Sequence, residues 1–514
     1  MMDREQRFLI VRSAGQPCLR ALLDLIARPG RSIHVLSPNP VEDPRIDAVF
    51  PILRITRRSV SLGGTLPDSR RYDKVFLLLD LRLYTLLSYR KFSRFVEQSR
   101  LGDCVHVFGH WNGKLLGRQS SQLTAAFRTA RRRAVAALGY GLRLLLAVVR
   151  PITHVRLCDI RVERIGHLAA NNESFLRKAY LEKDRGPFVL VSRRSDRIAN
   201  RQLFTMLARR VPVVRSSLLA DIITSPTFRR SPSMVDLWSS FRSTVECREL
   251  DAAPPQLRWL PQEESQGAAI LAEMGVDSWF ACFHTRDDAY LNATFPDVDW
   301  CYHDFRDADI HDYLPAMRRV AALGGYAIRV GSIVKEPLRH DNHPRIIDYS
   351  TSRFQSDFMD VYLAAKCAYF VGSTAGLYLI ATIFNVPLVV CNGVFGHTGL
   401  SSRELMVPKN IWSVAENRLL TFGEVYRSGA SHILSWQEFR RHELRPVANT
   451  PDDIAAATEE LHERAFGTAR YSEDDELRQQ RFRDIYRRSS NQYYEYPSRI
   501  GRGFLSTYEH LLVD

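Results

Sequence analysis

Small polar residues separate two apolar runs in the segment CAYFVGSTAGLYLIATIFNVPLVVCN. The run Ala368–Val371 suits a buried parallel strand, and Leu377–Phe384 is apolar nearly all round, as a buried helix is. Free N–H groups and the positive end of the helix dipole would then point outward beside Ser373, Thr374 and Gly376. The segment predicts a phosphate seat, with helix capping by Ser373 or Thr374 as the alternative.

A second group of polar residues follows a buried strand within WFACFHTRDDAYL, which delivers His284, Arg286 and Asp287 where it leaves the sheet. Arg286 could clamp a diphosphate through two parallel hydrogen bonds while Asp287 fixes its orientation. The alternative is a surface ion pair beside a packed histidine. Arg329 and Gly331 end another expected strand of the same unit, so we expect them in the same crevice.

The loop in ERIGHLAANNESFL places Gly166 and His167 just before a helix. In a two-lobed enzyme that loop would face the cleft. His167 is therefore a candidate general base for an acceptor hydroxyl, because its pKa suits neutral pH. A helix-capping or packed histidine is the alternative.

Metal signals are weak. Asp297-Val-Asp299 and Asp307-Ala-Asp309 match an Asp-x-Asp pattern, and His340 and His343 share a polar loop. Such groupings arise readily in loops and at helix starts, so we predict no metal site.

The composition describes a globular protein of several domains. A length of 514 residues suggests about three units. Basic residues outnumber acidic ones by 71 to 57, which favours an anionic partner such as a nucleotide or an anionic membrane surface. No RNA-binding signature, zinc finger or helix-turn-helix pattern is present, so we expect no nucleic-acid partner. The eight dispersed cysteines form no Cys-x-x-Cys pair, which indicates a reducing, cytoplasmic compartment.

The elements that must position these residues alternate between strand and helix. The alternation within residues 1–118 predicts a small α/β unit with a parallel sheet and a helix at Leu83–Gln98. Residues 152–266 and 267–470 predict two Rossmann-like units with a cleft at their strand carboxyl ends, followed by a helical tail at 471–514. Strands are expected at Arg7–Ser13, Ser32–Ser37, Lys74–Leu81, Cys104–Phe108, Arg156–Arg164, Phe188–Ser192, Pro212–Arg215, Trp279–His284, Tyr326–Val330, Ile346–Asp348 and Leu388–Cys391.

A basic connecting helix is expected at residues 119–151. Its apolar run is shorter than a bilayer span and is interrupted by Arg143. A packed inter-domain helix is the favoured interpretation. The alternative is a helix lying flat on an anionic membrane, which would make the protein peripheral at the inner face of the cytoplasmic membrane.

Several motifs in order resemble a family of bacterial glycosyltransferases of surface-carbohydrate synthesis. They are RIGHLAANNESFL, FACFHTRDDAYL, YAIRVG, FQSDFMDVYLAAKCAYFVGSTAGLYLIATIFNVPLVVCN, VPKNIWS with LTFGEVY, and RIGRGFLSTYEHLL, and they cover about residues 152–514. The resemblance implies a GT-B architecture, with an acceptor lobe at 152–266 and a nucleotide-sugar lobe at 267–470. It also implies no obligatory metal and no cofactor beyond the nucleotide-sugar co-substrate.

His284 and Arg286 are also similar to the His-x-Arg element of fucosyltransferase-type GT-B enzymes, where the arginine meets the donor diphosphate. Asp287 stands where those enzymes usually place a second arginine. The resulting prediction is a glycosyltransferase with His167 and Arg286 as catalytic residues. The expected partners are a nucleotide-sugar donor and a glycan, lipid-linked or protein acceptor. The alternatives are a nucleotide-sugar epimerase or hydrolase of the same shape, and a non-catalytic basic scaffold. Donor contacts are expected from His284, Asp287, Arg329, Gly331, Ser373, Thr374 and Gly376.

Overall fold

The structure is a computed structural model, and its description covers most of the chain. The described residues are 6–12, 19, 22–24, 26–29, 31–37, 41, 43–55, 60–62, 72, 74–80, 105–111, 114–116, 118–184, 186–235, 237, 248–294, 300–339, 343–396, 399–489 and 496–513. The chain divides into two compact units, Met1–Leu138 with Phe295–Asp299 and Gly139–Thr294 with Trp300–Asp514. The finer predicted boundaries at residues 266 and 470 stay predictions.

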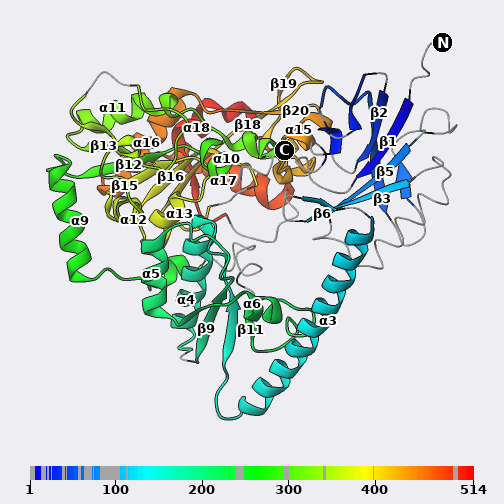
Figure 1. The fold of residues 1–514 in the computed structure, drawn as a ribbon. Helices are drawn as coiled ribbons and strands as arrows, with labels where there is room; N and C mark the ends of the chain where they lie inside the picture. Colours follow the sequence, from blue (N-terminus) through cyan, green and yellow to red (C-terminus); the bar gives the residue numbers. More distant parts are fainter. Residues whose placement is uncertain are drawn as a thin grey trace. The chain divides into compact units, whose positions relative to one another are not determined.

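The first unit contains a seven-stranded sheet in the order β4-β3-β2-β1-β5-β6-β7 (Figure 1). The five central strands are parallel, and the two edge strands pair antiparallel. The predicted α/β unit is thereby confirmed, while its predicted helix at Leu83–Gln98 lies outside the described residues. The strands are β1 (Gln6–Arg12), β2 (Arg31–Ser37), β3 (Ala48–Ile55), β4 (Val60–Leu62), β5 (Lys74–Asp80), β6 (Val105–Trp111) and β7 (Lys114–Leu116).

The predicted connecting helix is α3 (Arg118–Val149), which crosses the boundary between the two units. Within the described part of the chain, no helix is long and apolar enough to cross a membrane.

The second unit begins with a four-stranded parallel sheet in the order β10-β9-β8-β11. β9 (Phe188–Ser192) has the predicted bounds, and α5 (Arg201–Arg210) follows it. β8 (Arg156–Asp159) is shorter than the predicted strand Arg156–Arg164, because its ladder runs out where β9 ends. The other elements are β10 (Val213–Arg215), β11 (Met234–Val235), the π-helical turn η1 (His167–Asn171), α4 (Asn172–Leu181), α6 (Ser217–Ile223) and α8 (Glu249–Ala252).

A larger sheet of seven parallel strands follows in the same unit, in the order β14-β13-β12-β15-β16-β17-β21. Its first five strands in the chain were predicted within one or two residues at each end. β21 comes from the tail that the sequence predicts as helical, and it pairs with β17 because residues 499–500 run alongside it. The strands are β12 (Phe280–His284), β13 (Tyr326–Arg329), β14 (Ile346–Asp348), β15 (Tyr369–Gly372), β16 (Leu388–Gly393), β17 (Glu404–Pro408) and β21 (Arg499–Ile500).

The helices around this sheet include α11 (Leu314–Ala322), α12 (Asp357–Lys366), α13 (Tyr378–Ile383), α16 (Pro451–Ala465) and α17 (Glu473–Ser489). Figure 1 shows α5 of the smaller sheet beside α12 of the larger one. Two hydrogen bonds between backbone and side-chain atoms fix this junction, since Arg201 N–H donates to Asp357 Oδ2 at 2.7 Å and Asn200 Nδ2 donates to Asp357 O at 2.8 Å. The α/β class with parallel sheets, predicted from the alternating pattern, is confirmed.

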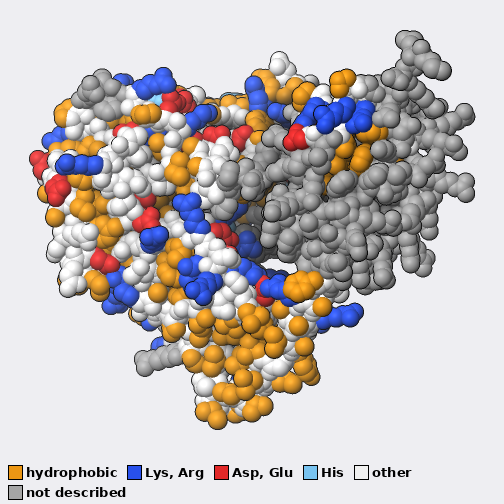
Figure 2. Space-filling view, in the orientation of Figure 1, with side chains coloured by type: hydrophobic (Ala, Val, Ile, Leu, Met, Phe, Trp, Pro, Cys, Tyr) orange, Lys and Arg blue, Asp and Glu red, His pale blue; other side chains and the backbone are white. Residues whose placement is uncertain are grey.

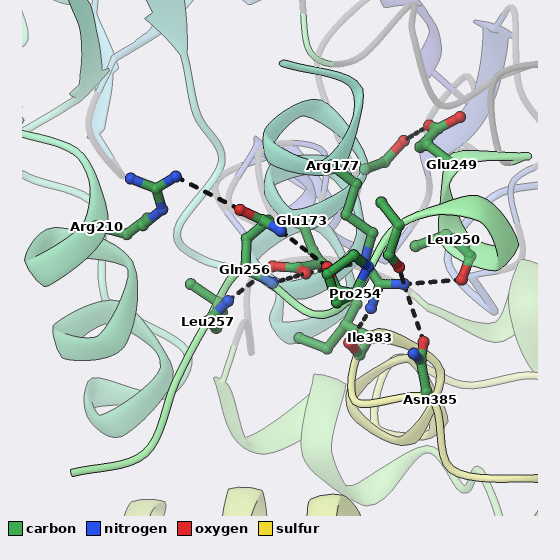
Figure 3. A network of polar contacts seen from close by, with 12 residues as sticks. Glu173, Arg177, Arg210, Glu249, Leu250, Pro254, Gln256, Leu257, Ile383 and Asn385 are labelled. Atoms are coloured by element: carbon green, nitrogen blue, oxygen red, sulfur yellow. Dashed lines mark hydrogen bonds and ion pairs between the residues drawn. The ribbon is translucent and has the colours of Figure 1, made fainter. Parts of the chain in front are cut away.

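A buried ion pair ties the two sheets of the second unit together (Figure 3). Glu173 and Arg177 on α4 are both fully buried and lie 2.9 Å apart. Arg177 also donates to Leu250 O and to Asn385 Oδ1, each at 2.9 Å or less, and to Ile383 O at the end of α13. One guanidinium thus satisfies acceptors on α4, on α8 and at the end of α13, which fixes α4 against the helix α13 of the larger sheet.

Candidate functional site

The predicted loops after β12 and β15 are joined directly. His284 lies opposite Gly372 in the ladder, Ser373 N–H donates to His284 O at 3.1 Å, and Arg286 N–H donates to Ser373 Oγ at 2.8 Å. The carboxyl ends of adjacent parallel strands meet at one sheet edge, so these residues come together as their positions in the sequence predicted.

The hydroxyls of Ser373 and Thr374 both accept hydrogen bonds from backbone N–H groups. Ser373 is fully buried and Thr374 nearly so, and Thr374 Oγ1 accepts from Val394 N–H at 3.3 Å. Neither residue caps α13, whose N-cap is Leu377 without a side-chain bond, and that helix is only six residues long. Both hydroxyls therefore accept a backbone N–H and help to shape the loop, and the phosphate contacts predicted at Ser373, Thr374 and Gly376 stay a prediction.

Gly376 brings the predicted acceptor loop against this one. A Cβ built on Gly376 would lie 2.9 Å from Ile165 Cγ2 and 3.1 Å from Gly166 N, and a Cβ on Gly166 would lie 3.1 Å from Gly376 Cα. Both positions need glycine because the two backbones touch. His167 therefore starts η1 immediately beside the loop that follows β15.

Arg286 is a buried cation at this edge, with 7% of its surface exposed. Nη1 donates to His303 O at 3.2 Å and pairs with Asp307, while Nη2 is buried and has no hydrogen-bond partner among the described residues. Burial lowers the pKa of Arg286, against the opposing effect of nearby carboxylates. An unsatisfied buried guanidinium nitrogen is costly unless something pairs with it, so Nη2 indicates a place for an anion.

Three further cations surround Arg286. Arg306 has its pKa lowered to about 10 by burial and then by Arg286 and Arg164. Lys409 has its pKa lowered to about 8 by burial and then by Arg286, and its Nζ donates to Phe305 O at 3.0 Å and Asp307 O at 2.8 Å. We call Arg164, Arg286, Arg306 and Lys409 the cation cluster.

His303 adds no charge to the cation cluster at neutral pH. Burial, then Arg306, Arg286 and Arg164, lower its pKa to about 3. The ring stacks at 6.1 Å on Trp300, over which Arg164 also lies at 5.3 Å, and Tyr302 is 3.9 Å from His303. Mutual repulsion among cations held close together makes the cluster favourable for an anion, with an aromatic group beside it.

The remaining predicted donor residues lie around an acidic cavity of about 290 Å³ at the ends of β12 and β13, which Asp287 and Arg329 line. Asp287 accepts from Ala289 N–H and Lys335 N–H at 3.0 Å each, and Arg329 donates to Glu336 O at 2.7 Å. Both side chains thus hold the loop that follows β13. The other charged residues of this cavity are Asp288, Asp307, Asp309, Lys335 and Glu336.

Gly331 and His284 shape the same loop. Gly331 has φ of +147°, a conformation that favours glycine, and an added Cβ would lie 3.5 Å from His284 Nδ1. Burial lowers the pKa of His284, so its neutral ring donates from Nδ1 to Val330 O at 3.0 Å. The crevice predicted as one site therefore has an acidic side and a cationic side. Asp307 belongs to both, because it pairs with Arg286 and lines the cavity.

Asp309, His311 and Glu336 could hold a divalent cation beside this cavity, since one ligand atom of each lies within 4.8 Å of the others. Both ring nitrogens of His311 already have partners, with Nδ1 2.8 Å from Asp309 Oδ1 and Nε2 accepting from Arg339 N–H at 3.2 Å. A metal would have to displace one of these bonds. The sequence prediction of no metal stays a prediction.

His167 lines a separate small cavity of about 40 Å³, which Asn171, Arg161 and Arg229 also line. Asn171 Nδ2 donates to Leu237 O at 2.7 Å, which fixes its oxygen toward His167 Nδ1 at 3.2 Å. His167 therefore donates from Nδ1 and keeps Nε2 as its acceptor, and burial lowers its pKa so that the ring is neutral. A neutral imidazole with an accepting Nε2 is the form a general base needs.

Sequence reasoning missed three members of the cation cluster. Lys409 directly follows a buried strand, as Arg286 nearly does, so its position in the sequence could have identified it as a site residue. Arg164 stands two residues before Gly166 in the recognised loop. Arg306 lies in the short helix η3 (Cys301–Arg306), where no pattern distinguishes it from a solvated arginine.

No family model matches this chain, and no curated protein matches it. Several solved structures do match. Escherichia coli ADP-heptose LPS heptosyltransferase II shares 13% identity, with 75% of this chain and 84% of that chain covered and a TM-score of 0.21. A glycosyl transferase of family 9 from Veillonella parvula shares 8% identity, with 90% and 98% covered and a TM-score of 0.29. A UDP-N-acetylglucosamine 2-epimerase shares 8% identity, with 92% and 98% covered and a TM-score of 0.19.

Proposed function

We propose that this chain is a glycosyltransferase that moves a sugar from a nucleotide-sugar donor to a hydroxyl of a glycan, lipid-linked or protein acceptor in bacterial surface-polysaccharide synthesis. The observation that carries the proposal is the cation cluster around Arg286, whose Nη2 has no hydrogen-bond partner among the described residues. It lies where the loops of two parallel sheets meet, as the resemblance of the motifs implies for the donor diphosphate.

In the proposed reaction, the bond between the anomeric carbon and the β-phosphate oxygen breaks as the acceptor oxygen bonds to that carbon. Negative charge then develops on the leaving nucleoside diphosphate. Arg286, Arg306 and Lys409 stabilise that charge from fixed positions, which requires little reorganisation during the reaction. Arg164, on the loop before η1, approaches the same charge from the smaller sheet.

The acceptor side of the proposal rests on His167. Its neutral ring and its accepting Nε2 suit removal of the proton from the attacking hydroxyl. The contact between Gly166 and Gly376 places His167 next to the loop that follows β15. Because the cavity beside His167 is small, the acceptor presents a single hydroxyl there while its bulk stays outside.

Calorimetric titration with ADP, GDP and UDP tests the donor site. At least one should bind, and Arg286→Ala should weaken that binding by about 1.5–3 kcal/mol, the range for a charge-assisted hydrogen bond. Arg470→Ala is the matched control, because Arg470 is an exposed arginine outside the cluster. A folded protein that binds none of the three would support the scaffold alternative.

Product analysis tests the reaction. A transferase releases nucleoside diphosphate in proportion to a glycosylated acceptor, so donor should be consumed only when acceptor is present. Conversion of the donor alone to a new nucleotide sugar, or to free sugar, would instead establish the epimerase or the hydrolase. His167→Ala should abolish transfer while leaving nucleotide affinity unchanged.

A further inference from the structure

The helix α3 has an unusual charge composition. Its 32 residues contain no Asp or Glu, and its charged residues are all arginines. A solvated helix normally mixes both signs of charge. This helix therefore has no acidic side chain that could meet a basic partner.

One face of α3 is packed against the smaller sheet of the second unit. Leu142 and Leu146 pack onto a core that includes Ile223 and Phe228. Gly139 allows the close approach, since a Cβ there would lie 2.5 Å from Ser225 Oγ. This contact fixes which side of the helix faces outward.

The opposite face is apolar and exposed. Tyr140, Leu144 and Val148 are spaced four residues apart, so they form one stripe, and they are 55%, 50% and 77% exposed. Leu145 on the helix and Ile152 in the turn that follows it are also exposed, at 59% and 89%. Figure 2 shows hydrophobic side chains gathered at this end of the second unit. We call these five residues the α3 outer face.

Arginines flank the α3 outer face. Arg132 and Arg143 are eleven residues apart on α3, which brings them to within about 20° of one another around a helix of 3.6 residues per turn, and Arg150 directly follows the last residue of the helix. Long arginine side chains beside an apolar stripe can keep their charge at a lipid headgroup while the stripe enters the acyl boundary.

We propose that the α3 outer face docks on a membrane surface that carries anionic lipids. The charge on the helix selects this occupant, because arginines without acidic neighbours complement an anionic surface. Two copies of this chain meeting through this face would bring arginines together with no countercharge. The helix lies on the surface and does not cross it, because its opposite face is part of the protein core.

Vesicle flotation of the full-length protein tests the proposal. The protein should float with vesicles of phosphatidylcholine and phosphatidylglycerol, float much less with phosphatidylcholine alone, and dissociate as salt concentration rises. Val148→Glu should reduce binding to the anionic vesicles at least tenfold, and the double variant Arg143→Gln, Arg150→Gln should reduce both the binding and its salt dependence.

Leu477→Glu is the matched control, because Leu477 on α17 is an exposed leucine at 57% and lies outside the α3 outer face. It should float like the wild type. Substitutions at exposed positions keep the packing of Leu142 and Leu146, which deletion of the helix would destroy. Equal binding of the Val148→Glu variant, or equal binding to both vesicle types, would overturn the proposal. So would a stable dimer in light scattering that Val148→Glu dissociates. Nucleotide affinity is independent of all these outcomes.

Discussion

The buried Lys409 makes diphosphate binding depend on protons in a defined pH window. Its pKa in the folded protein is about 8, against an ordinary value of 10.5, and the first cause is burial. A bound diphosphate would supply the negative charge that this site lacks and would raise the pKa again. Binding should therefore be coupled to proton uptake by Lys409.

The size of the uptake follows from the pKa of about 8. At pH 8 about half of the Lys409 side chains are deprotonated, so each binding event should take up about half a proton. At pH 7 the uptake should fall to about a tenth of a proton. Above pH 8 the affinity should decrease by up to about tenfold per pH unit, since a proton must then be bound together with the ligand.

Calorimetry in buffers of different ionisation enthalpy measures this uptake directly. The titration uses whichever of ADP, GDP and UDP binds, at pH 7.0 and pH 8.0, where the phosphates, with a second pKa of about 6, are already largely ionised. His303 does not interfere, because its pKa of about 3 keeps it neutral in both conditions.

Lys409→Met is the matching variant, since it keeps the length of the side chain and removes the titrating group. It should bind more weakly and without proton uptake at pH 8. Uptake that persists in this variant, or that is absent from the wild type at pH 8, would show that the ligand does not contact Lys409. The cation cluster would then be the wrong site.

Three further predictions concern the scaffold of the site. Arg177→Met leaves Glu173 buried without its partner and should lower the free energy of unfolding by about 3–5 kcal/mol. Arg209→Met, at a part-exposed ion pair, should lower it by about 1 kcal/mol or less. Urea denaturation measures both variants, and equal losses of unfolding free energy would contradict the role of the network. Gly376→Ala should force the loop after β15 away from Gly166 and reduce transfer at least tenfold, while Gly141→Ala, where an added Cβ meets nothing within 4 Å, should leave transfer unchanged. Burial raises the pKa of Asp360 to about 7, so the folded state holds a proton that the unfolded state releases at a lower pH, and stability should fall as pH rises from about 4 to 7. Asp360→Asn should remove about 2–4 kcal/mol of that decline between pH 5 and pH 8, and parallel pH profiles for both proteins would refute the assignment.

Local pattern in the sequence was sufficient for the α/β class and for the strands whose ends position the candidate site. Apolar runs of strand length, each followed by a polar loop, predicted β12, β13, β15 and β16 and the residues that leave them. The joining of Arg286 to Ser373 followed from one rule, that neighbouring parallel strands present their carboxyl ends at the same edge. β3 was not predicted because Pro51 interrupts its strand-like pattern. β21 was not predicted because a strand of two residues is too short to show the alternation of a strand.

Tertiary structure alone decided which side chains face which. Arg164, Arg306 and Lys409 come from three segments far apart in the chain, and only the strand order and the contact between the two sheets bring their charges around Arg286. The same is true of the partners of Ser373 and Thr374, whose hydroxyls accept hydrogen bonds from the backbone N–H groups of Arg286 and Val394. Periodicity reports whether a residue is buried, because burial repeats with the local helix or strand geometry. It does not report the partner, because the partner depends on strand order and on contacts between residues distant in the sequence.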